Sequence, residues 1–256
     1  MSFPPKPDDT RPFLVDVSSH QGIIDWEKML THIDPVVRGV AIRAGICWGY
    51  TDKWFAQNWK EAHSVGFSRT SYHVLYPLEP IDKQMTHWFN IMGDDLGEAA
   101  PVLDVELIHN ASRKQITDAA WASCQWVETR TDKYPMIYSR PYFVRDSMQK
   151  ADWFGEVDWW MALYAKTCEH NGTGLKEMCA AAGVPFERVR IQQTGDKGIG
   201  APFGCQSLAL DFDRWLGTEE ELAEFFGEAI VQPVIPTYQI NKPANVGDFN
   251  ISIIEV

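Results

Sequence analysis

Eight short apolar runs recur along the chain, and most of them are separated by a segment whose apolar side chains have helical spacing. Short apolar runs that alternate with helices predict buried parallel strands, and eight of them predict a β/α barrel. Because only residues 194–206 separate the last two runs, some connecting helices must be short or missing. We therefore expect an α/β fold, an irregular TIM-like (β/α) barrel with eight strands. The runs occupy residues 13–17, 39–45, 71–76, 101–106, 136–138, 159–164, 189–193 and 207–211.

Segments between the runs carry the signals of helices. Residues 54–66 repeat apolar side chains at intervals of three or four and end in a glycine, which predicts an amphipathic helix with a glycine cap. Ser112 with Gln115, and Thr218 with Glu221, form capping boxes that open two further helices.

Three parts are expected in the chain. Residues 1–12 form a proline-rich lead, residues 13–230 the barrel, and residues 231–256 a linker with a C-terminal tail. The tail ends in the apolar segment 249–254, and an exposed apolar strand invites pairing with another chain. We expect the tail either to fold back on the barrel or to mediate assembly, by self-association or with a virion partner.

The charge of the chain argues against one class of partner. With a formal net charge of −12 and no run of Lys or Arg, the chain is not expected to bind nucleic acid, where basic surfaces supply most of the affinity. No apolar run approaches the roughly 18 residues that a membrane span requires. Residues 1–10 contain no apolar signal segment, which predicts synthesis in the cytoplasm. Five cysteines without a paired C-x-x-C predict reduced thiols and no metal site.

Two carboxylates end the fourth apolar run. Asp104 and Glu106 are spaced i, i+2, so on a strand they point to the same face, roughly 7 Å apart. Two acids in different environments can divide acid and base roles, which is the chemistry of glycosidic bond cleavage. Taken alone, the pair is more typical of an ordinary strand end with two solvated acids.

Polar and aromatic side chains also end the other runs, and in a β/α barrel these ends meet at one mouth. Acids at the ends of the first, fourth and eighth runs together are rare by chance, which favours a catalytic site there. The candidate catalytic residues are Asp16, Asp104, Glu106 and Asp211, and the candidate substrate-binding residues are Arg43, Tyr76, Tyr138, Trp160, Tyr164 and Gln193.

With these residues in order, the sequence resembles glycoside hydrolase family 25, the muramidase lysozymes common in phages and bacteria. The resemblance runs from about Phe13 to Leu222. It rests on the segments 16–22, 41–44, 58–66, 72–73, 103–106, 160–164, 193–194 and 210–211.

The sequence departs from the family pattern at several points. Leu14 stands where a glycine is usual, and residues 68–70 read Ser-Arg-Thr in place of a small glycine turn. The segment 166–187, which contains a short Ala-rich helix, has no counterpart in the family. Asp213 lies near Asp211, although Asp211 follows the apolar run directly and is the better candidate.

The resemblance implies hydrolysis of peptidoglycan at the β-1,4 bond between N-acetylmuramic acid and N-acetylglucosamine, without metal or cofactor. Glu106 is the expected general acid and must hold a proton, which neighbouring Asp104 and Asp211 would favour. Asp104 either orients the substrate's acetamido group for attack or is itself the nucleophile. Asp16 and Asp211 would hold sugar hydroxyls and stabilise positive charge on the ring.

Two other functions remain open from the sequence. The tail is also typical of a virion-associated tail component that carries a lysozyme domain. A carbohydrate-binding barrel without turnover is the second alternative, which the four retained acids argue against. A lytic enzyme of this kind would reach the wall after holin-dependent release or from a phage particle.

Overall fold

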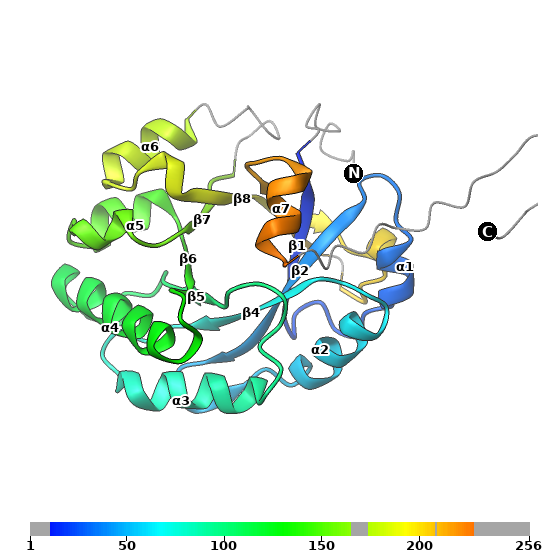
Figure 1. The fold of residues 1–256 in the computed structure, drawn as a ribbon, viewed down its shortest axis with the longest axis horizontal. Coiled ribbons are helices and arrows are strands. Elements are labelled where there is room, and N and C mark those ends of the chain that lie inside the picture. The colour runs from blue at the N-terminus through cyan, green and yellow to red at the C-terminus, as the bar shows by residue number, and fades with distance from the viewer. Residues whose placement is uncertain (1–10, 165–173, 208, 228–256) are drawn as a thin grey trace, which may run out of the picture.

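Eight strands form a closed barrel with helices on its outside, as Figure 1 shows. The computed structural model describes residues 11–164, 174–207 and 209–227. The strands are β1 (Phe13–Val17), β2 (Val37–Ile46), β3 (Tyr50–Thr51), β4 (Arg69–Val74), β5 (Val102–Asp104), β6 (Met136–Ser139), β7 (Trp159–Ala162), β8 (Val189–Ile199) and β9 (Ala209–Trp215). The α-helices are α1 (Trp26–Leu30), α2 (Phe55–Ser64), α3 (Ile81–Met92), α4 (Arg113–Thr131), α5 (Pro141–Ser147), α6 (Leu175–Ala182) and α7 (Glu219–Phe225).

The order of strands closes the ring. The sheet runs β1-β9-β8-β7-β6-β5-β4-β2-β3, and the additional pairing of β1 with β2 joins its ends, leaving β3 as a short appendage. The expected irregular eight-stranded barrel is therefore confirmed. The two capping boxes and the Ala-rich helix, α6, are confirmed as well. The proposed tail, 231–256, and the lead up to residue 10 lie outside the described residues.

The last strand of the ring runs in the opposite direction to the others. β9 is antiparallel to both β8 and β1, whereas the other neighbours within the ring are parallel. Antiparallel strands can be joined by a short link, but parallel strands need a crossover of a dozen or more residues. The prediction that a strand over 207–211 ends at Asp211 is wrong: β9 begins at Ala209 and runs away from the mouth. Asp211 reaches the mouth because it lies near the start of the strand.

Four other strand ends differ from the prediction. The strand predicted over 101–106 ends at Asp104, so Glu106 follows it in a loop. Tyr76 and Tyr164 likewise lie two residues beyond the ends of β4 and β7. The strand predicted to end at Gln193 continues to Ile199. At β4 and β5 the apolar run continues past the strand because the next residues, Leu75 and Val105, are buried as well.

Two separate hydrophobic clusters hold the barrel together. The larger one lies between the strands and the outer helices, and the smaller one fills the interior of the barrel. Leu222 of α7 and the following Phe226 are buried in the interior cluster. α7 thus closes the end opposite the mouth, lying across the barrel in Figure 1. The site is left open at one end only.

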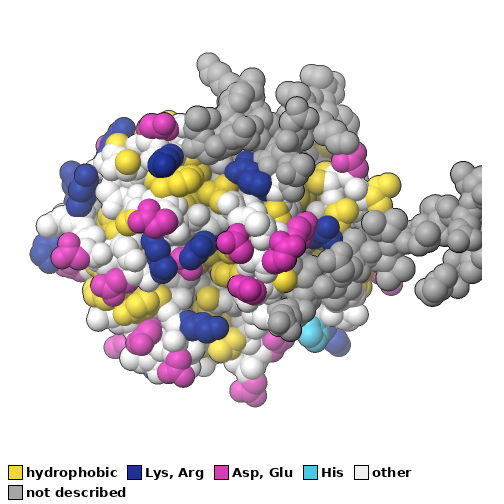
Figure 2. All heavy atoms as spheres, turned by 45° about the horizontal axis from the view of Figure 1, so that its top comes forward, with side chains coloured by type: hydrophobic (Ala, Val, Ile, Leu, Met, Phe, Trp, Pro, Cys, Tyr) yellow, Lys and Arg dark blue, Asp and Glu magenta, His cyan; other side chains and the backbone are white. Residues whose placement is uncertain are grey.

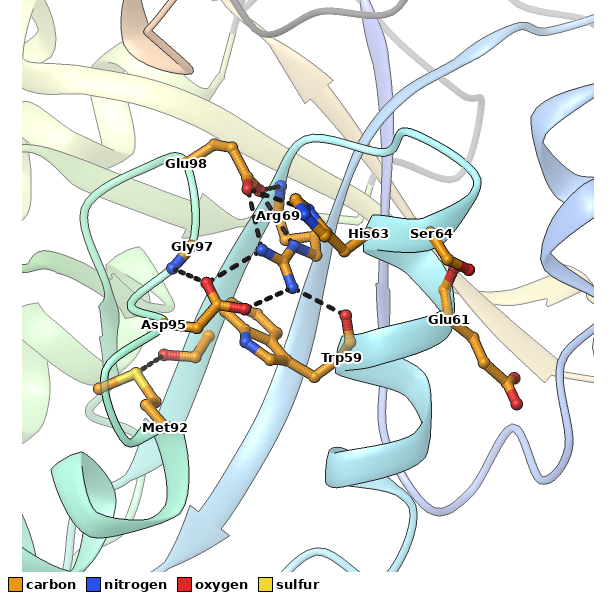
Figure 3. A network of polar contacts seen from close by, with 10 residues as sticks. Trp59, Glu61, His63, Ser64, Arg69, Met92, Asp95, Gly97 and Glu98 are labelled. Carbon is orange, nitrogen blue, oxygen red and sulfur yellow. Dashed lines mark hydrogen bonds and ion pairs between the residues drawn. The ribbon is translucent and has the colours of Figure 1, made fainter.

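A buried arginine fixes the entry to β4 and β5 (Figure 3). Arg69, which stands in the unusual Ser-Arg-Thr segment, is 1% exposed and stacks on Trp59 with its guanidinium carbon 4.3 Å from the ring centre. It forms bidentate hydrogen bonds of 2.9–3.1 Å with the carboxylates of Asp95 and Glu98. Its carbonyl accepts the backbone N–H groups of Glu98 and Ala99. These bonds hold the segment that leads into β5 and its carboxylates.

Charged side chains of both signs are interspersed on the face shown in Figure 2. On the described residues of that face, the basic side chains form no continuous stripe. Within the same described part of the chain, no helix is both long and apolar enough to cross a bilayer.

Candidate active site

The open end of the barrel contains a cavity of about 640 Å³. Nine of the ten residues selected from the sequence line it: Asp16, Arg43, Tyr76, Asp104, Glu106, Tyr138, Trp160, Gln193 and Asp211. The tenth, Tyr164, lies beside it and donates its hydroxyl hydrogen to Gln193 Oε1 at 2.6 Å. The strands therefore bring the sequence candidates together at one mouth.

The two carboxylates after β5 occupy different environments. Asp104 is 5% exposed, and its Oδ1 has no hydrogen-bond partner among the described residues. Burial, followed by the negative charges of Glu106 and Asp16, raises the pKa of Asp104 well above its usual range. The side chain of Glu106 is 28% exposed and forms an ion pair with Arg140, Nη2 to Oε2 3.3 Å. The pair thus combines a buried carboxyl with a more open one.

A second group of acids lies on the adjacent strands β1 and β9. Asp16 and Asp211 are opposite each other in the ladder, and Asp213 is fully buried two residues further along β9. Burial raises the pKa of Asp16 to about 6, against hydrogen bonds from its neighbours that lower it. Burial and the charge of Asp16 raise the pKa of Asp211 to about 8 and that of Asp213 well above the normal value. Since three like charges this close cannot all ionise, the group retains protons near neutral pH.

Gln193 connects this acidic group to the tyrosines. Its Nε2 donates to Asp16 Oδ2 at 2.6 Å, while its Oε1 accepts the hydroxyl hydrogen of Tyr138 at 2.8 Å as well as that of Tyr164. Trp160 Nε1 donates to Asp213 Oδ1 at 2.9 Å. Tyr138, Trp160 and Tyr164 therefore help to orient Asp16 and Asp213 through their polar groups.

Arg43 is held by an acid that sequence reasoning missed. Asp52 is 2% exposed, and its Oδ2 accepts Arg43 Nε at 2.9 Å and the backbone N–H of Ser19 at 2.9 Å. Its Oδ1 accepts the N–H of Trp54, the residue before α2, at 3.0 Å. Arg43 also donates to Ser19 Oγ at 3.0 Å. Asp52 thus joins β2 to the loop that follows Asp16.

Apolar and aromatic side chains line the cavity beside the acids. They include Ile46, Tyr76, Leu107, Tyr138 and Trp160. Tyr76 also stacks on His109, with ring centres 4.0 Å apart. An open cavity lined by both aromatic and acidic side chains suits a ligand with apolar faces and many hydroxyl groups, such as a sugar chain. No group of three or more His, Cys, Asp or Glu among the described residues is placed to hold a metal ion.

Comparison with known proteins identifies the family. The family model described as glycosyl hydrolases family 25 matches residues 15–179, well over half of the chain. The chain belongs to glycosyl hydrolase family 25. As a member of this family it is a glycoside hydrolase, and the match includes Asp16, Asp104 and Glu106 but ends before Asp211.

Relatives agree with this assignment. The uncharacterized protein YegX of Escherichia coli O6:H1 is 29% identical over 217 residues, which are 82% of this chain and 72% of YegX. A bacterial lysozyme from Streptomyces coelicolor has the same fold, with a TM-score of 0.69 at 18% identity, covering 87% of this chain and all of that one. A family 25 glycosyl hydrolase from Bacillus anthracis gives 0.68 at 19% identity, covering 86% and 95%.

Proposed function

We propose that the chain is a peptidoglycan hydrolase that cleaves the β-1,4 bond between N-acetylmuramic acid and N-acetylglucosamine. The observation that carries the proposal is the Asp104–Glu106 pair at the mouth of a family 25 barrel. Solved proteins with this fold include a muramidase from Trichobolus zukalii and a lysozyme from Streptomyces coelicolor, which supports a peptidoglycan substrate. The aromatic and hydrogen-bonding side chains that line the cavity fit a glycan strand.

In this mechanism Glu106 is the general acid. Because Asp104 and Glu106 repel each other's charge, the pair retains one proton at a pH where isolated carboxyls would both be ionised. With glycan bound, that proton lies on Glu106 and passes to the glycosidic oxygen as the bond to the anomeric carbon breaks. The resulting Glu106 carboxylate then takes a proton from the water that completes hydrolysis.

Asp104 orients the substrate's own acetamido group in the proposed mechanism. Its buried Oδ1, which has no partner among the described residues, is available to accept the acetamido N–H. The acetamido oxygen then attacks the anomeric carbon, and the Asp104 carboxylate stabilises the positive charge that develops on the nitrogen. The alternative, direct attack by Asp104, differs in one testable respect. A substrate without the N-acetyl group would still react by direct attack but not by the acetamido route.

Asp16 and Asp211 contribute in the proposal by binding sugar hydroxyls and by stabilising the positively charged ring. Gln193 supports this role, because its hydrogen bond to one carboxylate oxygen of Asp16 fixes the orientation of that side chain.

Product analysis tests the bond assignment. Peptidoglycan digested with the protein is reduced with borohydride, and the fragments are identified by mass spectrometry. We expect reduced muramic acid at the new ends. Reduced glucosamine at those ends would contradict the bond assignment even if the wall were degraded.

A further inference from the structure

Arg140 lies at the mouth and is used by neither the predicted site nor the mechanism above. It directly follows β6 and precedes Pro141, the first residue of α5, with an extended backbone (φ −109°, ψ 137°) that the proline favours. Its side chain is 51% exposed, and a single guanidinium nitrogen forms an ion pair with Glu106 at 3.3 Å. The Tyr138 phenol also lies beside the guanidinium. The cation is therefore placed at the general acid with much of its surface open.

The cavity itself has an unfavourable charge for an anionic ligand. Five carboxyl side chains line it, Asp16, Asp104, Glu106, Asp196 and Asp211, and the one lining arginine is Arg43. Arg43 is 2.9 Å from the buried Asp52 and is only 11% exposed, so its charge is already compensated. Arg140, by contrast, is an exposed cation beside Glu106 at the mouth.

We propose that Arg140 binds a carboxylate of the glycan substrate, exchanging its partner Glu106 for that carboxylate when the substrate binds. This inference rests on the proposed function, because glycan strands of peptidoglycan carry such groups and chitin does not. The carboxylate belongs either to the lactyl ether of muramic acid or to the stem peptide attached there. Arginine suits the role, since its planar guanidinium can form two parallel hydrogen bonds with a carboxylate.

The exchange has a low cost and a chemical consequence. A partly exposed ion pair contributes little to stability, so Glu106 gives up its partner easily. A cation beside a carboxyl favours the ionised form, whereas a general acid must be protonated. When Arg140 turns to the substrate, the groups that still face Glu106 are the acids Asp16, Asp104 and Asp211 and the Tyr138 phenol. Binding of an anionic glycan thus leaves Glu106 among acids and a phenol, without its cation.

Binding measurements with Arg140→Gln test the proposal. Calorimetry is done with wild type, Arg140→Gln, Arg140→Lys and the matched control Arg145→Gln, which changes an exposed arginine within α5. Three ligands separate the sources: stripped glycan strands with free lactyl carboxylates, glycan strands that retain stem peptides, and neutral N-acetylglucosamine oligomers.

We expect Arg140→Gln to weaken binding of at least one of the two anionic glycans by about tenfold or more, and binding of the neutral oligomer by less than about twofold. The anionic glycan that responds identifies the source of the carboxylate. Arg140→Lys keeps the charge and recovers part of the affinity, and Arg145→Gln changes neither. Equal loss on charged and neutral ligands, or no loss on either anionic glycan, would overturn the proposal.

Turnover gives an independent readout. In Arg140→Gln we expect KM for the responding anionic glycan to rise by about tenfold while kcat stays within about twofold, because the lost contact binds substrate and transition state alike. An unchanged KM contradicts the exchange. If wild type binds the anionic glycans in the manner described but cleaves none of them, the proposed function fails while the assignment of Arg140 stands. If it cleaves them and Arg140→Gln binds as wild type does, only the assignment of Arg140 fails.

Discussion

Replacing Asp211 with asparagine should stabilise the protein at alkaline pH while abolishing most of its activity. The pKa of Asp211 is raised from 3.8 to about 8, first by burial and then by the charge of Asp16. An acid with a raised pKa in the folded state binds protons more tightly there than in the unfolded chain. Its contribution to stability is fully present below about pH 4 and is lost as the pH rises to about 8.

The structure sets the magnitude of this effect. The difference between the two pKa values of Asp211 corresponds to roughly 5–6 kcal/mol, at about 1.4 kcal/mol per pKa unit. The cavity is open to water, which screens part of this cost, so we expect Asp211→Asn to recover about 1–3 kcal/mol at pH 8. For a chain of this size that raises the melting temperature by roughly 2–12 °C.

Thermal melts between pH 4 and pH 8.5 measure the difference. The control is Asp94→Asn, which changes an exposed acid away from the cavity. We expect Asp211→Asn and wild type to melt alike at pH 4 and to separate as the pH rises, while Asp94→Asn follows wild type throughout. The reasoning is refuted if Asp211→Asn gains no stability at pH 8, or gains the same amount at pH 4.

Two further substitutions separate stability from catalysis. Arg69→Met removes the buried cation that pairs with Asp95 and Glu98, so we expect the free energy of unfolding to fall by about 3–5 kcal/mol, with kcat unchanged at low temperature. A fall of under about 1 kcal/mol in thermal melts contradicts the account. Asp52→Asn removes the charged partner of Arg43 at the mouth, so we expect kcat/KM on peptidoglycan fragments to fall by up to about 10²-fold. Unaltered kinetics would show that Arg43 does not need Asp52 to hold it in place.

The sequence predicted most strands because their burial is local information. Every residue of β1 and β7 is buried, and a continuous apolar run is the expected signature of such a strand. The direction of β9 could not be predicted in this way. An apolar run has no direction, and only the short link before it indicated a return in the antiparallel sense.

The sequence predicted those residues of the candidate site that directly follow an apolar run. Asp16, Asp104 and Asp211 follow apolar runs, so the barrel topology alone brings them together. Asp52 and Arg140 follow no such pattern, since their roles depend on contacts between elements that no spacing in the sequence reveals. Asp213 was noted only as a neighbour of Asp211, because the residue type alone does not show that a charged side chain is buried.

The central claim is that this barrel hydrolyses glycan strands with Glu106 as the general acid, and Glu106→Gln tests it most directly. The amide keeps the shape of the side chain but cannot donate the proton, so turnover of purified peptidoglycan should fall by about 10²–10⁴-fold with an unchanged melting temperature. Release of soluble muropeptides, quantified by chromatography for wild type and variant, measures this. An active wild type and an inactive, folded Glu106→Gln support the account. A folded variant that keeps about a tenth or more of wild-type turnover places the general acid elsewhere.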